Sequence, residues 1–138
     1  MYLIDTNVIS EARKRARANG GVIAFFETVA ASGEPVFLSA VSVGELSRGV
    51  ELIRRRGDAD QARRLEAWLA TLVESFRERI LAFDTDAAQV WGHLRVPDPS
   101  HALDNQIAAI ALVNGLILVT RNVADFAGSG VKLANPFQ

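Results

Sequence analysis

Short apolar runs alternate along this chain with longer stretches in which apolar residues recur at helical spacing. Glycine, proline or polar residues bound each run, which is typical of buried strands separated by turns and helices. Because the strands alternate with helices, the pattern predicts an α/β fold with a mostly parallel sheet and helices on both of its faces. The predicted strands are Tyr2–Ile4, Val36–Leu38, Ile80–Phe83, Leu116–Val119 and Val131–Leu133.

Helices are predicted in the segments between these strands. The first is expected to start at a cap formed by Thr6 or Asn7. The segment 60–76 has one apolar and one charged face, so we expect it to stack on the preceding helix as a helical hairpin. The predicted helices cover residues 6–17, 22–31, 42–57, 60–76, 86–94 and 104–114.

The composition fits one soluble globular unit. With 138 residues, 49% of them hydrophobic and 22% charged, the chain is expected to form a single domain over residues 1–138. No stretch approaches the roughly 18 to 20 uninterrupted apolar residues that cross a bilayer. Asp5 and Asn7 interrupt the first apolar run, which argues against a secretory signal. We therefore expect a cytoplasmic protein with no membrane segment.

The ionisable residues restrict the metal chemistry. The chain has no cysteine, and its two histidines, His93 and His101, cannot build a histidine-rich metal cage. A bound metal would be held by oxygen, which favours Mg²⁺, with Mn²⁺ as a substitute. Arginines cluster in the segments 13–17 and 54–64. These clusters suit contact with phosphates, but solvated helix ends explain them equally well.

One carboxylate, Asp5, directly follows the first predicted strand, and three more acids lie at comparable positions. Glu45 and Asp104 lie about one turn inside their helices, and Asp125 comes shortly after the fourth strand. In open α/β sheets, ligands bind beyond the carboxyl ends of the strands. Residues after the first and fourth strands share that edge, so we expect Asp5 close to Asn122 or Asp125. If the four acids meet, they form a metal site.

Helix capping is an alternative explanation for three of these acids. Ser42 and Glu45 have the spacing of a capping box, and Asn122–Asp125 is a looser version of it. Asp104 suits the dipole at the start of its helix.

Asp5 differs from the other acids because Thr6 or Asn7 is available to cap the first helix. Burying an unpaired charge costs several kcal/mol. A divalent cation would offset that cost, whereas several acids crowded together without a metal would repel one another. The cluster therefore predicts a metal.

Four blocks, in order along the chain, resemble the PIN-domain ribonucleases and, among them, the VapC and FitB toxins of bacterial toxin–antitoxin pairs. The blocks are Leu3–Ser10, Leu38–Leu46, Leu103–Ala109 and Val119–Phe126. The resemblance covers essentially the whole chain. It implies a PIN-like three-layer α/β/α sandwich, with four to five strands in the central sheet and a helical-hairpin insertion.

The resemblance also implies the site residues. It places metal ligands at Asp5 and Asp104, with Glu45 as the third acid. Many relatives carry a fourth acid where this chain has Asn122, and Asp125 is then the nearest carboxylate. The polar residues expected to support the acids are Thr6, Asn7, Ser39 and Thr120.

The activity implied is Mg²⁺-dependent cleavage of RNA by phosphodiester hydrolysis, leaving a 5′-phosphate. Arg13, Arg15 and Arg121 are candidates to hold the RNA phosphates, although Arg121 could equally pair with an acid inside the fold. The resemblance further implies a homodimer held inactive by a small cognate antitoxin, in a heterotetramer or larger assembly. Apolar residues on the predicted hairpin would supply the antitoxin surface or belong to the core.

Three other interpretations use the same residues less fully. A receiver-type phosphorylation domain would use Asp84 and Thr120 but needs paired acids after the first strand. A phosphatase with an aspartate nucleophile needs a second aspartate where Asn7 stands. The chain could also be a PIN-like module that binds nucleic acid or protein without catalysis, its acids acting only as helix caps.

Overall fold

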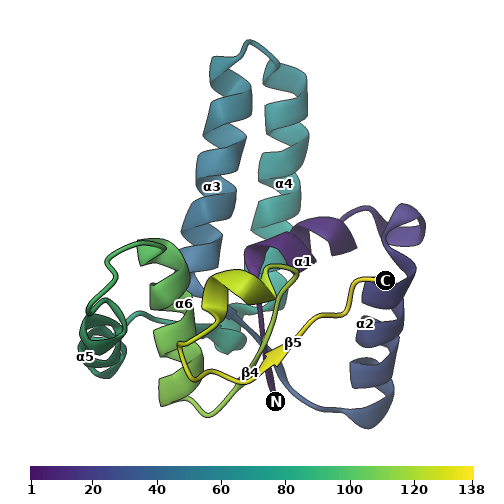
Figure 1. The fold of residues 1–138 in the computed structure, drawn as a ribbon. Coiled ribbons are helices and arrows are strands. Elements are labelled where there is room, and N and C mark those ends of the chain that lie inside the picture. Colours follow the sequence, from purple (N-terminus) through teal and green to yellow (C-terminus); the bar gives the residue numbers. More distant parts are fainter.

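A five-stranded parallel sheet forms the centre of the computed structural model, which describes residues 1–138 (Figure 1). The strand order is β3-β2-β1-β4-β5, so β1 lies in the middle of the sheet with β2 and β4 as its neighbours. This arrangement confirms the predicted parallel sheet. The strands are β1 (Tyr2–Ile4), β2 (Val36–Ser39), β3 (Ile80–Leu81), β4 (Ile117–Val119) and β5 (Leu133–Ala134).

Alternate residues of the strands face two separate cores, one on each side of the sheet. Leu3 and Leu118 are buried in a core closed by α5 (Thr85–Leu94) and α6 (Ala102–Val113). Ile4, Leu38 and Val119 are buried in the other core. The helices α1 (Thr6–Ala12) and α2 (Gly20–Ser32) close that side. The fold is therefore the predicted three-layer α/β/α sandwich.

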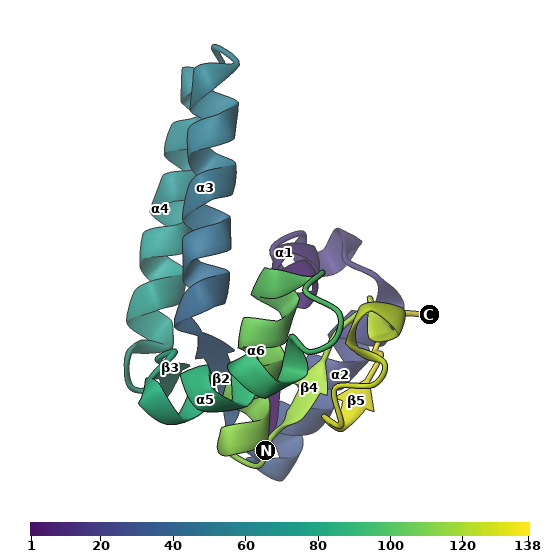
Figure 2. The same ribbon diagram turned by 60° about the vertical axis from the view of Figure 1, so that its left-hand side comes forward.

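The predicted helical hairpin is also confirmed. It consists of α3 (Ala40–Arg55) and α4 (Ala59–Ser75), which stack along their length and project away from the sheet (Figures 1 and 2). At its base, Trp68 and Leu72 of α4 pack against the core beside α1. Val50 is buried, whereas Leu52 is an exposed large apolar residue. The apolar residues of the hairpin thus divide between core and surface.

Several predicted elements have different bounds in the structure, and α2, α3 and α6 each start two residues earlier than predicted. The first helix stops at Ala12 and a separate 3₁₀ turn, η1 (Arg15–Arg17), follows it, because Arg15 adopts a left-handed φ of 55°. β3 ends at Leu81, and Asp84 then caps α5 by accepting a hydrogen bond from the Ala87 backbone N–H. The last strand lies at Leu133–Ala134, further along the chain than predicted.

No helix combines the length and the apolar character that crossing a membrane would require.

Candidate metal centre

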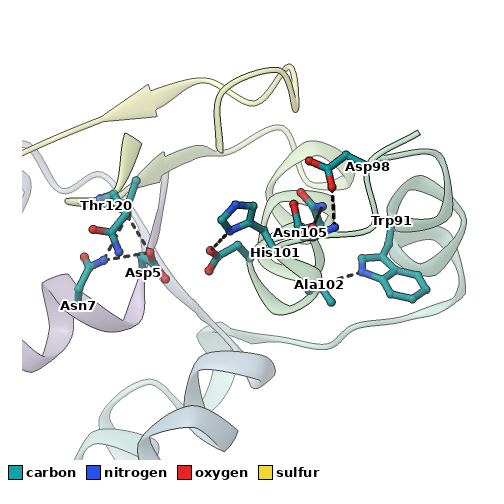
Figure 3. Close-up of polar contacts among 11 residues, drawn as sticks. Asp5, Asn7, Trp91, Asp98, His101, Ala102, Asn105 and Thr120 are labelled. Atoms are coloured by element: carbon teal, nitrogen blue, oxygen red, sulfur yellow. Dashed lines mark hydrogen bonds and ion pairs between the residues drawn. The ribbon is translucent and has the colours of Figure 1, made fainter. Parts of the chain in front are cut away.

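Asp5 lies at the carboxyl edge of the sheet, in the position that the strand register assigns to it. Ile4 pairs with Val119, and the Asp5 backbone N–H donates to the Val119 carbonyl at 2.9 Å. The next residues along the two strands, Asp5 and Thr120, are therefore neighbours. The Thr120 hydroxyl donates to Asp5 Oδ2 at 2.8 Å, and both residues are buried (Figure 3).

Asp5 also caps α1, so the expectation that Thr6 or Asn7 would cap this helix is wrong. Asp5 Oδ1 accepts a hydrogen bond from the Thr6 backbone N–H at 2.8 Å. The Asn7 amide donates to Asp5 Oδ2 at 3.3 Å and to the Thr120 hydroxyl at 3.4 Å. Its oxygen accepts the Arg121 backbone N–H at 3.1 Å. Asn7 thereby links the segments that follow β1 and β4.

Burial raises the pKa of Asp5 above its ordinary value. Hydrogen bonds from Thr120, Thr6 and Asn7 lower the pKa and oppose this effect, while the nearby charge of Asp125 raises it further. The net rise means that the hydrogen bonds only partly compensate the buried carboxylate. A cation beside Asp5 would favour its charged form.

Glu45 reaches the same edge from α3, and the predicted capping box with Ser42 does not form. The residue that caps α3 is Ser39, whose hydroxyl accepts the Ser42 backbone N–H at 3.0 Å. The helix therefore begins earlier than that prediction required, and Glu45 lies beyond its first turn. Glu45 Oε1 instead accepts a hydrogen bond from the Thr6 hydroxyl at 2.8 Å. Ser39, expected beside the acids, serves the helix start.

Asp104 contributes the third carboxylate from the first turn of α6. Its pKa is raised to about 6, mainly by burial and then by the charges of Asp5, Asp125 and Glu45. The other three acids thus all act on Asp104 electrostatically. Such repulsion is the expected property of carboxylates that share a cation site.

The fourth carboxylate is Asp125, in the 3₁₀ turn η3 (Val123–Phe126). Ligand atoms of Asp125, Asp104 and His101 all lie within 4.8 Å of one another. Asn122 makes no side-chain cap, so the looser capping box is absent. Its backbone N–H donates to the Thr120 hydroxyl at 3.0 Å. Of the two candidates for the fourth group, Asp125 is the one whose carboxylate lies beside Asp104.

His101 belongs to this cluster, and the sequence analysis did not select it. It immediately precedes α6, and its Nδ1 lies 3.8 Å from Asp104 Oδ2. The available signal was its position three residues before Asp104, because such pairs share a face at a helix start.

The three arginines proposed for RNA lie around this edge rather than in it. The Arg121 guanidinium lies 4.9 Å from the centre of the Phe137 ring, and its charge helps to lower the pKa of Glu11. Arg13 lies over the Trp68 ring at 5.9 Å. Arg15 is exposed in η1, beyond the end of α1. All three cations thus remain available to an anionic ligand.

The donor set fits a hard divalent cation. Asp5, Glu45, Asp104 and Asp125 supply carboxylate oxygens, the ligands that Mg²⁺ and Mn²⁺ prefer. The chain contains no thiol that would favour softer metals.

A three-layer α/β/α domain with acids gathered at the carboxyl edge of its parallel sheet defines the class of protein. This chain belongs to the PIN-domain family, whose model matches residues 2–127.

Relatives within the family match over essentially their full length. The chain is 35% identical to the toxin FitB of Neisseria gonorrhoeae, over 99% of both sequences. It is 31% identical to the VapC ribonuclease Y4jK of Sinorhizobium fredii, over 100% of this chain and 99% of the relative. The crystal structure of FitAcB from Neisseria gonorrhoeae superimposes with a TM-score of 0.84 at 33% identity, covering 99% of this chain and 98% of that one.

Proposed function

We propose that this chain is a Mg²⁺-dependent endoribonuclease and the toxin of a toxin–antitoxin pair. The observation that carries the proposal is the convergence of acids from separate segments: Asp104 and Asp125 have carboxylate oxygens within 4.8 Å of each other, and the charges of Asp5 and Glu45 also act on Asp104. The names of the two relatives, one a toxin and one a VapC ribonuclease, support the same activity.

Bound Mg²⁺ would supply an activated water and offset the charge that develops on the phosphate during hydrolysis. The chain's own contribution is a preorganised set of ligands. Three hydrogen bonds, from Thr6, Asn7 and Thr120, fix the orientation of the Asp5 carboxylate. Such fixed groups need little rearrangement during the reaction.

Glu45 and Asp125 are the acids best placed to accept a proton. Thr6 holds one oxygen of Glu45, and the other has no hydrogen-bond donor within the fold. Asp125 is only partly buried, and its side chain forms no hydrogen bond within the fold. Either carboxylate therefore has a free oxygen with which to take the proton released by the attacking water.

The basic segment Arg13–Arg17 would hold the RNA backbone. It follows the carboxyl end of α1, whose first residue lies beside Asp5. At a rise of about 1.5 Å per residue, the segment starts roughly 10 Å from the acids. That separation suits contact with a phosphate one or two nucleotides from the one being cleaved.

RNA cleavage in the presence of Mg²⁺ tests the proposal. Asp5→Asn keeps hydrogen-bond acceptors for the cap of α1 while removing the charge, so it separates catalysis from capping better than alanine does. Asp5→Asn and Asp104→Asn are each expected to lower the cleavage rate by on the order of 100-fold or more. Asp86→Asn, an exposed acid in the first turn of α5, is the matched control and should cleave like the wild type.

Equal cleavage by the wild type and the two site variants would refute the enzyme and favour the non-catalytic module. The growth of cells that express the chain tests the toxin assignment separately. Expression of the wild-type chain should arrest growth, expression of Asp5→Asn should not, and co-expression of a small cognate antitoxin should restore growth.

A further inference from the structure

His101 differs from the acids of this cluster because its side chain offers nitrogen atoms, rather than oxygen atoms, to a metal ion. The structural evidence for its role is geometric. His101 Nδ1 and Asp104 Oδ2 are 3.8 Å apart, which is longer than a hydrogen bond. Two atoms that each lie about 2.1 Å from one metal ion are separated by up to roughly 4.2 Å. The gap is therefore the right size for two ligands of one ion.

Asp125 approaches the same point from η3. The ligand atoms of His101, Asp104 and Asp125 fit within 4.8 Å of one another, so a small inward movement of side chains brings all three to one ion. His101 and Asp125 also line a common pocket of about 230 Å³ between the 94–101 loop and the 127–129 turn. This pocket would give water or a phosphate oxygen access to an ion held by His101 and Asp125.

Three hydrogen bonds hold the backbone around His101 in place. The Trp91 indole N–H donates to the Ala102 carbonyl at 3.0 Å. The Asn105 side chain donates to the Ser100 carbonyl at 3.3 Å, and Asp98 accepts the Ser100 backbone N–H at 2.9 Å (Figure 3). His101 itself adopts a left-handed conformation, with φ 56°. Its imidazole thus starts from a fixed point beside Asp104.

We propose that His101 is a metal ligand of this centre, forming with Asp104 and Asp125 a mixed nitrogen and oxygen subsite on the outer side of Asp5. The inference rests on the proposed function, because it assigns a further ligand to the same metal centre. An imidazole ligand favours transition ions over Mg²⁺. His101 would therefore make the centre select Mn²⁺ more strongly than carboxylates alone would.

Pulsed electron paramagnetic resonance of the Mn²⁺-loaded protein tests this directly and needs no RNA. Nitrogen coordination gives the Mn²⁺ echo a ¹⁴N modulation, which the wild type is expected to show. His101→Asn is the substitution of choice, since asparagine tolerates the left-handed backbone. It should abolish the modulation and weaken Mn²⁺ binding about tenfold, with a smaller effect on Mg²⁺.

His93→Gln is the matched control, because His93 lies on α5 and hydrogen-bonds the Gln89 carbonyl. It should keep both the modulation and the Mn²⁺ affinity. A wild type that binds Mn²⁺ without ¹⁴N modulation, or a His101→Asn variant that retains it, overturns the assignment and leaves the nuclease proposal standing. Absence of Mn²⁺ binding by the wild type overturns both.

Discussion

At the scale of single residues, Asp5 both caps a helix and belongs to the acidic cluster. The sequence suggested instead that Thr6 or Asn7 caps the helix and that Asp5 serves the cluster alone. Its backbone extends the pairing of β1 with β4, and its carboxylate both caps α1 and faces the other acids. The sequence predicted its place at the strand end, because an apolar run followed by Asp is visible in the residues alone. The cap could not be assigned, because Asp5, Thr6 and Asn7 are all good capping residues. Only the backbone geometry selects one of them.

For His101 and Asp125, the sequence could not show whether the side chain reaches the site. Each lies outside a regular strand, so no periodicity or strand register fixes where its side chain points. Asp125 was selected but remained an alternative to Asn122, and the 3₁₀ turn settles which of the two meets Asp104.

The burial of Asp104 and its repulsion by the neighbouring acids make a prediction for the metal-free protein. Asp104 has a pKa of about 6 in the fold against 3.8 ordinarily, so the folded state binds its proton more tightly. The free energy of unfolding should then fall as the pH rises from about 4 to about 6. Asp104→Asn should raise it near pH 7 by on the order of 1 kcal/mol, less than the full shift implies, because solvent screens this partly exposed group.

Urea denaturation in the presence of a chelator, at about pH 4.5 and about pH 7.5, measures this effect. The difference in stability between the two pH values should be smaller in Asp104→Asn than in the wild type. Asp86→Asn should leave that difference unchanged. An equal pH dependence in wild type and Asp104→Asn would contradict the assigned repulsion.

At the scale of elements, the caps of α1 and α3 are two of the differences between prediction and structure. The cap of α3 at Ser39, rather than at Ser42, releases Glu45 from a capping role. Both serines are good caps, and the choice depends on where β2 ends against its neighbours. The first helix also ends earlier than predicted. Arg15 adopts a left-handed conformation after that helix, and nothing in the run Arg13–Arg17 marks this residue in the sequence. The hairpin was predictable because its apolar pattern extends over many residues, and the strands were predictable because each lies in a short apolar run bounded by polar or turn residues.

The start of α2 gives a second prediction. Gly21 packs against the final residues of the chain, and a Cβ added there would overlap the Pro136 carbonyl oxygen. Asn19 holds the same region by accepting the Gln138 backbone N–H at 3.0 Å. Gly21→Ala is therefore expected to lower the free energy of unfolding by about 2 kcal/mol.

Gly49, inside α3, is the matched control because a Cβ there meets nothing within 4 Å. Gly49→Ala should raise the free energy of unfolding by about 0.5 to 1 kcal/mol through helix propensity. Urea denaturation of both variants measures these changes in the free energy of unfolding. Gly21→Ala as stable as the wild type would mean that the end of the chain leaves α2 easily.

At the scale of the whole molecule, the acidic centre brings together segments that lie far apart in the sequence. Asp5 follows β1, Glu45 belongs to the base of the projecting hairpin, and Asp104 belongs to the helical layer on the opposite face. An ion bound by all three would hold the layers together. The acids repel one another in the metal-free protein, and a cation bound between them would attract each of them and offset that repulsion.

Metal binding should therefore stabilise the entire fold. At a Mg²⁺ concentration of about 100 times its dissociation constant, linkage gives roughly 2.7 kcal/mol and a rise in Tm of several degrees. Asp5→Asn should show little of this rise. Sodium chloride at matched ionic strength is the control for screening, and an equal rise in sodium chloride would show that no specific ion is bound.

The strand order has a consequence for a chain still being synthesised. β4 inserts between β1 and β5, and Thr120, which holds Asp5, comes after β4. A nascent polypeptide that has emerged only as far as the hairpin carries Asp5 and Glu45 but neither Asp104 nor Thr120. During synthesis the cluster therefore remains incomplete until the segment that carries Thr120 and Asp125 has been made.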